Sequence, residues 1–433
     1  MKISRRDVLK TASLATAGAA AVASVARVTP AAPPQTASAS ALPPAFASLK
    51  PLGDRVKPIR AEEYQQRIAH AQELMANSKP QFQALFIAPG TSLVYFTGIH
   101  WWPSERILAL LIPRHGDPFL VSPSFEEGRL REQLHWPIEI RTWQEDESPF
   151  AIAAKTLTDR GVTTGQVGVD APMYYGFFDR MRQAATSLDF VSGSPVIDLC
   201  RAQKSAHELE LMRLACSATF DVYKALFGSL KEGMTQREVG HLLELGFAKM
   251  NLEGDALVLF GPSAALPHGT HEEQILREGM GILIDGGTTV EGYHSDITRT
   301  GVLGKPTDQL QRAFEIVRGA QDAALAAAVA GHECGSVDDA ARKVILDAGF
   351  GPNYKYFTHR LGHGIGLDEH EYPYLVRGSK ITLQPNMTFS NEPGIYVPGE
   401  YGLRCEDDMA IAESGSAQLL TAGFQPSLEK PIA

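Results

Sequence analysis

The chain has 433 residues, enough for two or three domains with substantial hydrophobic cores. Its formal net charge of −10 at pH 7 argues against nucleic acid or an anionic membrane surface as the main partner. The hydrophobic fraction of 44% and the charged fraction of 21% are those of an ordinary soluble protein.

Residues 1–39 have the pattern of an export signal. Arg5 and Arg6 precede the stretch TASLATAGAAAVASVA at 11–26, which carries no charge. Twin arginines before a weakly apolar, Ala-rich stretch resemble a twin-arginine signal. The stretch is too short and too poor in Leu, Ile and Phe to hold a membrane span, and the small residues at 37–39 mark a cleavage site. We therefore expect an exported, periplasmic protein; the alternative is a cytoplasmic protein with a disordered basic tail.

Residues 40–57 continue a segment rich in Pro, Ala and Ser, which predicts a flexible linker. Residues 58–200 then alternate between helical and strand patterns. The stretch EEYQQRIAHAQELM at 62–75 places apolar residues on one helical face. Short apolar runs that look like strands follow at 84–88, 93–96, 107–112 and 118–121. We expect one α/β domain here.

Residues 201–433 begin with two well-marked helices. Ser205 with Glu208, and Thr235 with Glu238, have the spacing of a capping box at a helix start. Strand patterns at 256–303, helical patterns from 307 and after 336, and strand patterns from about 356 follow. The order helix, helix, sheet, repeated once, predicts an α+β domain of two similar αα-β halves.

The cysteines indicate neither a zinc ribbon nor a small disulfide scaffold. They are far apart in the chain and form no Cys-x-x-Cys pair: Cys200, Cys216, Cys334 and Cys405. We expect each to be a buried free thiol.

The segment GILIDGGTTVEGYHSDITRT at 281–300 predicts a strand, a Gly-Gly turn and a returning strand. Asp285 stands at the end of the first apolar run, and Asp296 lies eleven residues on. A twisted hairpin can bring the two carboxylates to within a few ångströms. Taken alone, two Asp residues near glycines are usually turn residues.

The segment HRLGHGIGLDEHE at 359–371 holds three histidines, which is unusual for a core or a solvated face. Its glycines allow a substrate or metal to approach the backbone closely, and they disfavour a regular helix. Glu392 then precedes a Pro-Gly turn, and Glu406 lies in GLRCEDD at 402–408. Each glutamate alone is ordinary for a turn or a solvated loop.

Together these segments supply the ligand set of a two-metal hydrolytic site. Four carboxylates and one imidazole are present: Asp285, Asp296, His363, Glu392 and Glu406. Two divalent cations would balance the four carboxylates, so a shared water can ionise to hydroxide near neutral pH.

The motifs GPSAALPHG, LIDGG, GYHSDITRT, HRLGHGIGLDEHE, SNEPGIY and GLRCEDD, in this order, resemble the metallopeptidase family with the pita-bread fold. This family includes Xaa-Pro dipeptidase (prolidase), Xaa-Pro aminopeptidase and methionine aminopeptidase. The resemblance covers about residues 60 to 425. It implies that Asp296 and Glu406 bridge two ions, that Asp285 completes one ion, and that His363 and Glu392 complete the other.

The resemblance also assigns residues around the reacting bond. His268 and His370 match positions that face the substrate and steady the tetrahedral intermediate, and His359 matches one that lines the pocket beyond the scissile bond. Arg404 either binds a substrate carboxylate or neutralises the nearby Asp407. Cys405 stands where relatives often carry an aliphatic residue; a thiol beside the metals would make the enzyme oxidation-sensitive.

The expected activity is hydrolysis of a peptide with proline at its second position. The metal-bridging hydroxide attacks the carbonyl, and Glu392 passes a proton to the leaving nitrogen. Manganese is the first choice of metal for this hard site, with zinc, cobalt and iron as alternatives. The motifs do not separate dipeptidase from aminopeptidase.

The α/β domain favours the Xaa-Pro branch, because methionine aminopeptidases generally consist of the catalytic domain alone. In relatives this domain mediates dimerisation, so a homodimer is expected. Trp101 and Trp102 either help to wall the site or lie in the core or an interface. Two rival functions are a metal-dependent hydrolase or lyase acting on a non-peptide small molecule, and a binding module that has lost catalysis.

Overall fold

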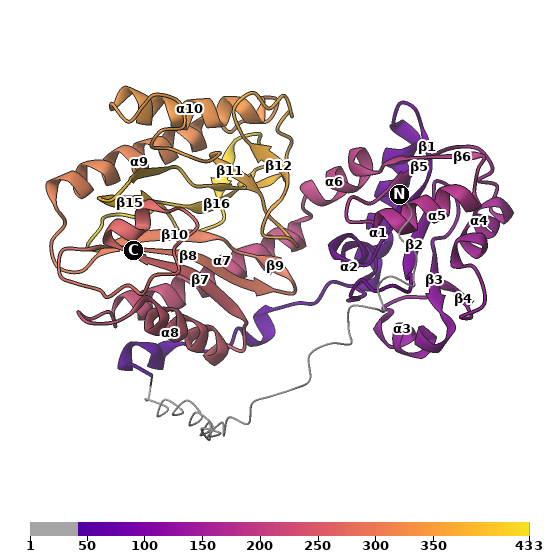
Figure 1. Ribbon diagram of the computed structural model, residues 1–433, viewed down its shortest axis with the longest axis horizontal. Helices are drawn as coiled ribbons and strands as arrows, with labels where there is room; N and C mark the ends of the chain where they lie inside the picture. Colours follow the sequence, from indigo (N-terminus) through magenta and orange to yellow (C-terminus); the bar gives the residue numbers. More distant parts are fainter. Residues whose placement is uncertain (1–41, 433) are drawn as a thin grey trace, which may run out of the picture. The chain divides into compact units, whose positions relative to one another are not determined.

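The computed structural model describes residues 42–432 (Figure 1), so the predicted export signal at residues 1–39 lies outside the described residues. Within residues 42–432, none of the helices combines the length and the apolar character that a membrane crossing requires.

The α/β domain is built on a six-stranded mixed sheet with the strand order β4-β3-β2-β1-β5-β6. The strands are β1 (Phe82–Ile87), β2 (Ala109–Pro113), β3 (Phe119–Pro123), β4 (Glu139–Trp143), β5 (Gly165–Val169) and β6 (Leu188–Ser192). The helices are α1 (Ala61–Asn77), α2 (Thr91–Thr97), α3 (Glu127–Gln133), α4 (Pro149–Asp159), α5 (Tyr175–Ala184) and α6 (Ser194–Ala202), with a 3₁₀ turn η3 (Ser124–Glu126).

Both faces of this sheet are buried, which explains why its inner strands are continuous apolar runs. Successive side chains of a strand point to opposite faces. Leu85 and Leu110 accordingly pack in one hydrophobic cluster, while Phe86 and Leu111 pack in another. The helices cover these two faces and complete the predicted α/β domain.

One predicted strand is wrong. The apolar run at 93–96 lies within helix α2. A run of four apolar residues does not distinguish a strand from one buried helical turn. Gly98, with a φ of 75°, ends this helix in the left-handed conformation, and Leu93 and Phe96 are fully buried.

The segment that the composition predicts to be a flexible linker is instead packed against the rest of the protein. Its residues form two 3₁₀ turns, η1 (Pro44–Ser48) and η2 (Gly53–Arg55), and we call residues 43–56 the N-terminal strap. Phe46 is fully buried in the same cluster as Phe247 of the C-terminal domain, and Lys249 Nζ donates to the Phe46 carbonyl over 2.7 Å. The large apolar residues of the strap, Phe46, Leu49 and Leu52, outweigh its linker-like composition.

The C-terminal domain has the predicted order of two helix pairs, each followed by a sheet. The first half comprises α7 (Ala206–Phe227), α8 (Gln236–Lys249), β7 (Gly254–Phe260), η4 (Gly261–Ala265), β8 (Gly281–Val290), β9 (Tyr293–His294) and β10 (Ile297–Val302). The second half comprises α9 (Asp308–Ala327), α10 (Cys334–Asp347), β11 (Gly362–Gly364), β12 (Glu371–Leu375), β13 (Thr388–Asn391), β14 (Gly394–Val397), β15 (Tyr401–Arg404), β16 (Asp407–Ile411) and β17 (Ala417–Leu419).

Both predicted capping boxes are present at the starts of α7 and α8. Helices α7 and α8 pack on β8 and β7, and α9 packs on β13 and β15 (Figure 1). Each half therefore has its own hydrophobic core. The predicted fold class, an α/β domain followed by a pita-bread domain, is confirmed.

The two sheets meet along β10. The Glu406 amide donates to the Thr298 carbonyl over 3.1 Å, and the Arg404 amide donates to Thr300 Oγ1 over 3.3 Å. The chain between β15 and β16 is thereby held against β10. This seam brings together acidic residues from sequence segments that lie more than one hundred residues apart.

Candidate metal centre

The first two carboxylates come from the antiparallel pair of β8 and β10. In this pair Asp285 stands opposite Thr298, and Asp296 immediately precedes β10. Gly286 follows Asp285 with a φ of 152°. A side chain there would come within 2.8 Å of the Ala256 Cα on β7, so the close approach of β7 requires glycine.

The other three predicted ligands come from the second sheet. His363 lies in β11, Glu392 follows β13, and Glu406 lies between β15 and β16. The Glu392 amide donates to the Leu361 carbonyl over 2.9 Å, which fixes the turn that carries its carboxylate. His363 Nε2 lies 3.5 Å from Glu392 Oε1 and 3.6 Å from Asp296 Oδ2.

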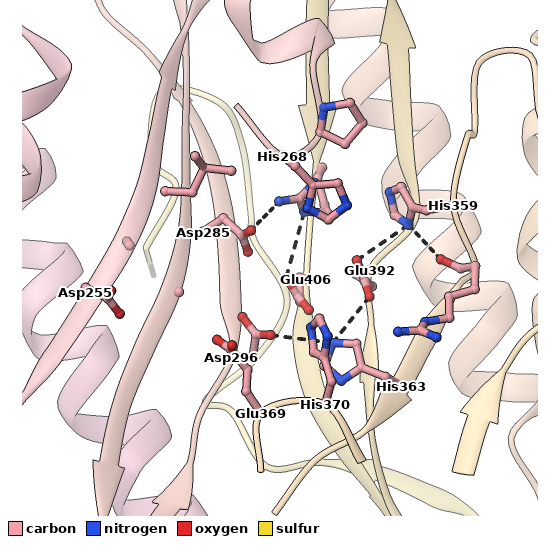
Figure 2. A pocket seen from close by; sticks show the side chains of 16 residues that line it. Asp255, His268, Asp285, Asp296, His359, His363, Glu369, His370, Glu392 and Glu406 are labelled. Carbon is pink, nitrogen blue, oxygen red and sulfur yellow. Dashed lines mark hydrogen bonds and ion pairs between the residues drawn. The ribbon is translucent and has the colours of Figure 1, made fainter. Parts of the chain in front are cut away.

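All five side chains point into one cavity, as Figure 2 shows. The donor atoms of these five side chains and of His370 form groups whose members lie within 4.8 Å of one another. The groups are Asp285 with Asp296 and Glu406, His363 with Glu392 and Glu406, and Asp296 with His363 and His370. Glu406 belongs to the first two groups, and Asp296 belongs to the first and third.

The negative charge of the carboxylates in this cavity is poorly balanced by positively charged side chains of the protein. Burial, together with the neighbouring acidic groups, raises the pKa of Asp296 and of Glu406 well above the usual range. Burial also raises the pKa of Glu392 to about 7. Clustered acids of this kind, with one imidazole, fit divalent cations, which neutralise the charge that the protein leaves unbalanced.

Asp285 is the exception, because Arg404 pairs with it. Burial opposes ionisation of Asp285, but the charge of Arg404 and the hydrogen bonds from its side chain and from Thr298 together outweigh that effect and lower the pKa of Asp285. The Thr298 hydroxyl lies between Asp285 and Glu406, 2.6 Å from Glu406 Oε2. Asp285 is thus held in its charged form by its own neighbours.

This arrangement corrects one of the two predicted roles of Arg404. Asp407 pairs over 2.6 Å with Arg299, so Arg404 does not neutralise it. Arg404 is buried, and besides Asp285 it donates from Nε to Thr298 Oγ1 over 3.0 Å and from Nη1 to the Tyr396 hydroxyl over 2.8 Å. The sequence could not show this, because Asp285 lies 119 residues from Arg404.

Three predicted histidines also line the cavity (Figure 2). His359 is fixed by two hydrogen bonds, from Nδ1 to the Arg360 carbonyl over 2.7 Å and between Nε2 and the Tyr396 hydroxyl over 2.8 Å. The ring of His370 lies 3.9 Å from that of His363, centroid to centroid. Burial lowers the pKa of His359 to about 3 and that of His370 to about 4, so both rings are neutral at neutral pH.

The expectation for Cys405 needs a correction. Its side chain is fully buried, and burial raises the pKa of the thiol to about 12. A neutral, inaccessible thiol reacts slowly with oxidants, so its position beside Glu406 does not by itself make the site oxidation-sensitive. As predicted, the four cysteines are buried and free.

The cavity, of about 620 Å³, is lined by three charged residues that the sequence analysis missed: Asp255, Arg360 and Glu369. The Arg360 guanidinium packs 4.2 Å from the centre of the Tyr374 ring, and within residues 42–432 no carboxylate lies within ion-pair distance of it. Arg360 and Glu369 are adjacent in sequence to predicted histidines of the segment 359–371. This proximity could have indicated that they line the cavity. Asp255 has no motif around it.

Comparison with known proteins gives two family matches. Residues 210–413 match the metallopeptidase family M24, and residues 67–203 match the creatinase/prolidase N-terminal domain. The chain is 33% identical over 341 residues to a Xaa-Pro dipeptidase of Lactobacillus delbrueckii subsp. lactis, and the match covers 76% of this chain and 90% of the relative.

Two solved structures are similar over nearly their whole length. A dipeptidase PepE from Mycobacterium ulcerans matches with a TM-score of 0.78 and 31% identity, covering 85% of this chain and 98% of that one. A prolidase from Thermococcus sibiricus matches with a TM-score of 0.73 and 31% identity, covering 83% and 97%.

Proposed function

The chain belongs to metallopeptidase family M24, and from this membership and the geometry of the cavity we propose that it is a metal-dependent dipeptidase that hydrolyses Xaa-Pro dipeptides. One observation carries the proposal. Four carboxylates and one imidazole converge from both halves of the C-terminal domain into a single cavity.

We propose the predicted assignment of metal ligands. Asp296 and Glu406 would serve both ions, Asp285 would complete one site, and His363 with Glu392 would complete the other. The shared membership of Asp296 and Glu406 in the ligand groups supports this division. When bound, two divalent cations polarise a carbonyl oxygen and lower the pKa of water.

Manganese is the proposed metal, because oxygen donors predominate among the ligands. The test is to reconstitute the metal-free protein with manganese, zinc, cobalt or iron(II) separately. We expect the highest turnover with manganese, and a clear preference for another ion would reject this choice.

Glu392 is the proposed proton carrier. The leaving nitrogen of an Xaa-Pro bond has no hydrogen of its own and must gain a proton as the bond breaks. Glu392 is suited to this role by its place, because its carboxylate lines the cavity 3.5 Å from His363 Nε2, within reach of a bond held in the cavity.

The histidines of the cavity would act as hydrogen-bond donors around the reacting carbonyl. We propose that His268 and His370 stabilise the tetrahedral intermediate, whose oxygen becomes negatively charged. His359, held by Tyr396, would line the pocket for the proline ring. Arg404 adds a buried positive charge next to Asp285, which favours the development of negative charge in the cavity.

The dipeptidase mode is supported by Arg360. A dipeptide ends in a carboxylate directly after proline, and Arg360 offers a guanidinium that the described protein leaves unpaired. Asp255 and Glu369, which also line the cavity, suit the ammonium group at the other end of a dipeptide. Figure 2 shows Asp255 across the cavity from His359, the neighbour of Arg360 in sequence.

The test compares the turnover of Ala-Pro, Ala-Pro-Ala and Met-Ala-Ser with defined metals. We expect Ala-Pro to be cleaved best. Arg360→Gln should raise KM for Ala-Pro by about 10- to 100-fold, because a charge-assisted hydrogen bond to the carboxylate is lost. The same substitution should leave KM for Ala-Pro amide nearly unchanged, since the amide lacks that charge.

The matched control is Arg377→Gln, which removes a guanidinium that also packs on a tyrosine ring but lies outside the cavity lining. It should leave KM unchanged. Efficient cleavage of Ala-Pro-Ala would instead indicate an aminopeptidase. Absence of turnover for both proline peptides would reject the proposed function.

We also propose a homodimer, supported by Trp102, whose side chain is 85% exposed in the single chain. Large exposed aromatic residues are enriched at protein interfaces. Light scattering coupled to size-exclusion chromatography should report twice the monomer mass for the wild type and less for Trp102→Ser. A monomeric wild type would reject the dimer.

Export by the twin-arginine route is proposed from the sequence of residues 1–39. Replacing Arg5 and Arg6 together by lysine should leave the protein in the cytoplasm, as read by cell fractionation. Equal recovery in the periplasm would reject this route.

A further inference from the structure

In the described part of the chain, the ring of His370 has no hydrogen-bond partner to fix it, in contrast to the rings of His359 and His363. It lies in the His370 loop, residues 365–370, which connects β11 to β12. Within residues 42–432 its ring makes no hydrogen bond, and its closest aromatic contact is the ring of His363. The position of the His370 ring therefore depends on where the backbone of the loop is held.

The side of the His370 loop away from the cavity is held by ionic and hydroxyl contacts. Thr91 Oγ1, at the start of α2, donates to Asp368 Oδ1 over 2.5 Å. Arg201, near the end of α6, pairs with Asp368 and donates to Glu371 Oε2 over 2.6 Å. Lys204 Nζ, just before α7, donates to Glu371 Oε1 over 2.5 Å.

These partners all come from outside the sheet that carries the loop. Thr91 and Arg201 belong to the α/β domain, and Lys204 lies in the short connection between the domains. Leu367 adds an apolar contact, because it packs against the hydrophobic clusters of both domains. Within the loop, Leu367 and Asp368 thus face the domain junction, and the next two residues, Glu369 and His370, line the cavity.

The fit at the junction is tight. Lys204 and Glu371 are almost fully buried, so their ion pair is shielded from water. A side chain at Gly366 would come within 2.6 Å of Glu371 Oε1 and 2.8 Å of Lys204 Cε. The backbone of the His370 loop at Gly366 is therefore in close contact with the ion pair of Lys204 and Glu371. A displacement of this ion pair should displace the loop.

We propose that Arg201 and Lys204 are positioning residues that hold the His370 loop through Asp368 and Glu371, and that the α/β domain thereby sets the place of His370 in the cavity. The inference rests on the proposed function, in which His370 faces the substrate. Displacements of about 1 Å of a catalytic group can lower turnover by about 100-fold. Loss of the outer anchors should therefore lower kcat.

The mildest test is Thr91→Val, which keeps the shape of the side chain and removes one hydrogen bond to Asp368. We expect kcat for Ala-Pro to fall by about 3- to 10-fold, with little change in KM or in bound metal. The matched control is Thr97→Val, in the same helix α2, whose hydroxyl donates to the Leu93 carbonyl and does not contact the loop. The control should keep its kcat even where it lowers the melting temperature.

The stronger test is Arg201→Gln, for which we expect kcat to fall by about 10- to 100-fold. Arg201→Lys restores a cation and should recover part of that loss, which a merely space-filling role of Arg201 would not predict. Hydrogen exchange of the amides at 366–371 should become faster in Arg201→Gln and in Thr91→Val than in the wild type or Thr97→Val.

The outcomes separate this inference from the proposed function. If the wild type fails to cleave Xaa-Pro dipeptides, the function is rejected, while hydrogen exchange still tests whether the anchors restrain the loop. If Arg201→Gln and Thr91→Val keep both the wild-type kcat and the wild-type exchange at 366–371, the positioning role is rejected. Parallel losses of kcat in Thr91→Val and Thr97→Val would also reject it.

Discussion

Two charged clusters of this protein differ in how their charges are balanced. The junction cluster between the domains has one cation for each carboxylate: Arg67, Arg201 and Lys204 with Glu208, Asp368 and Glu371. The catalytic cavity is lined by six carboxylates but by two guanidinium groups, those of Arg360 and Arg404. The junction is completed by the chain itself, whereas the cavity is complete only with cations from solution.

The largest expected effect comes from the cavity. Asp296→Asn removes a carboxylate that both proposed metal sites share, so metal and activity should be lost together while the fold remains. The loss of turnover should exceed the roughly 100-fold that outer-shell partners of a metal site typically contribute. Metal analysis, circular dichroism and Ala-Pro hydrolysis check this expectation. An active Asp296→Asn variant with full metal content would contradict the shared role.

A second prediction concerns the pH dependence of metal binding. Burial raises the pKa of Glu392 to about 7, so below that pH the metal-free carboxyl group holds a proton. An incoming cation must displace it, and metal affinity should therefore fall as the pH decreases below about 7. Calorimetry at pH 6 and pH 8, in buffers of different ionisation enthalpy, should show more proton release at pH 6. Equal release at both pH values would contradict this.

The third prediction breaks the junction instead. Arg67 pairs with Glu208 over 3.1 Å and also donates to the Tyr95 carbonyl and the Tyr293 hydroxyl. Arg67→Gln leaves a buried carboxylate without its cation, which should lower the free energy of unfolding by about 3 kcal/mol. Because the junction needs no metal, the folded variant should keep its metal content. Chemical denaturation measures the free energy of unfolding, and metal analysis measures the bound metal. A loss of metal with unchanged stability would contradict the separation of the two clusters.

The smallest expected effect lies beside the junction, at Asp170. Burial raises its pKa to about 6, above the value of about 3.9 in an unfolded chain. Between these pH values the folded state holds a proton that the unfolded state releases, so stability falls as the pH rises from about 4 to 6. The slope is about 1 kcal/mol per pH unit. In Asp170→Asn this contribution should disappear, and an unchanged slope would show that Asp170 does not cause it.

The sequence was sufficient for the fold class and for the five proposed metal ligands and three histidines of the cavity, but not for Asp255, Arg360 and Glu369. The predicted metal ligands lie in sequence segments where glycines and strand patterns constrain the backbone. These local sequence patterns were therefore strong indications of the site. The histidine at 268 had the weakest local signal of these, and its place in the cavity depends on the turn after η4.

The features that the sequence did not reveal depend on contacts between distant residues. The pairing of Arg404 with Asp285 arises only where the two sheets meet along β10. Asp407, which is close to Arg404 in sequence, forms its ion pair with Arg299 instead. The run at 93–96 has the composition of a strand, and only its packing makes it a helix. The docking of the strap is likewise decided by the surface that receives it.

That docking has a practical consequence for where the chain can be shortened. Removal of residues 1–39 leaves Phe46, Leu49 and Leu52 in their sites on the catalytic domain. The composition alone places the start of the first domain at residue 58. A recombinant protein that begins there would lack these three apolar side chains, and the surface that they cover on α7 and α8 would be exposed. The uncovered surface would favour aggregation during purification, so the shorter product would yield less material although every catalytic residue is retained.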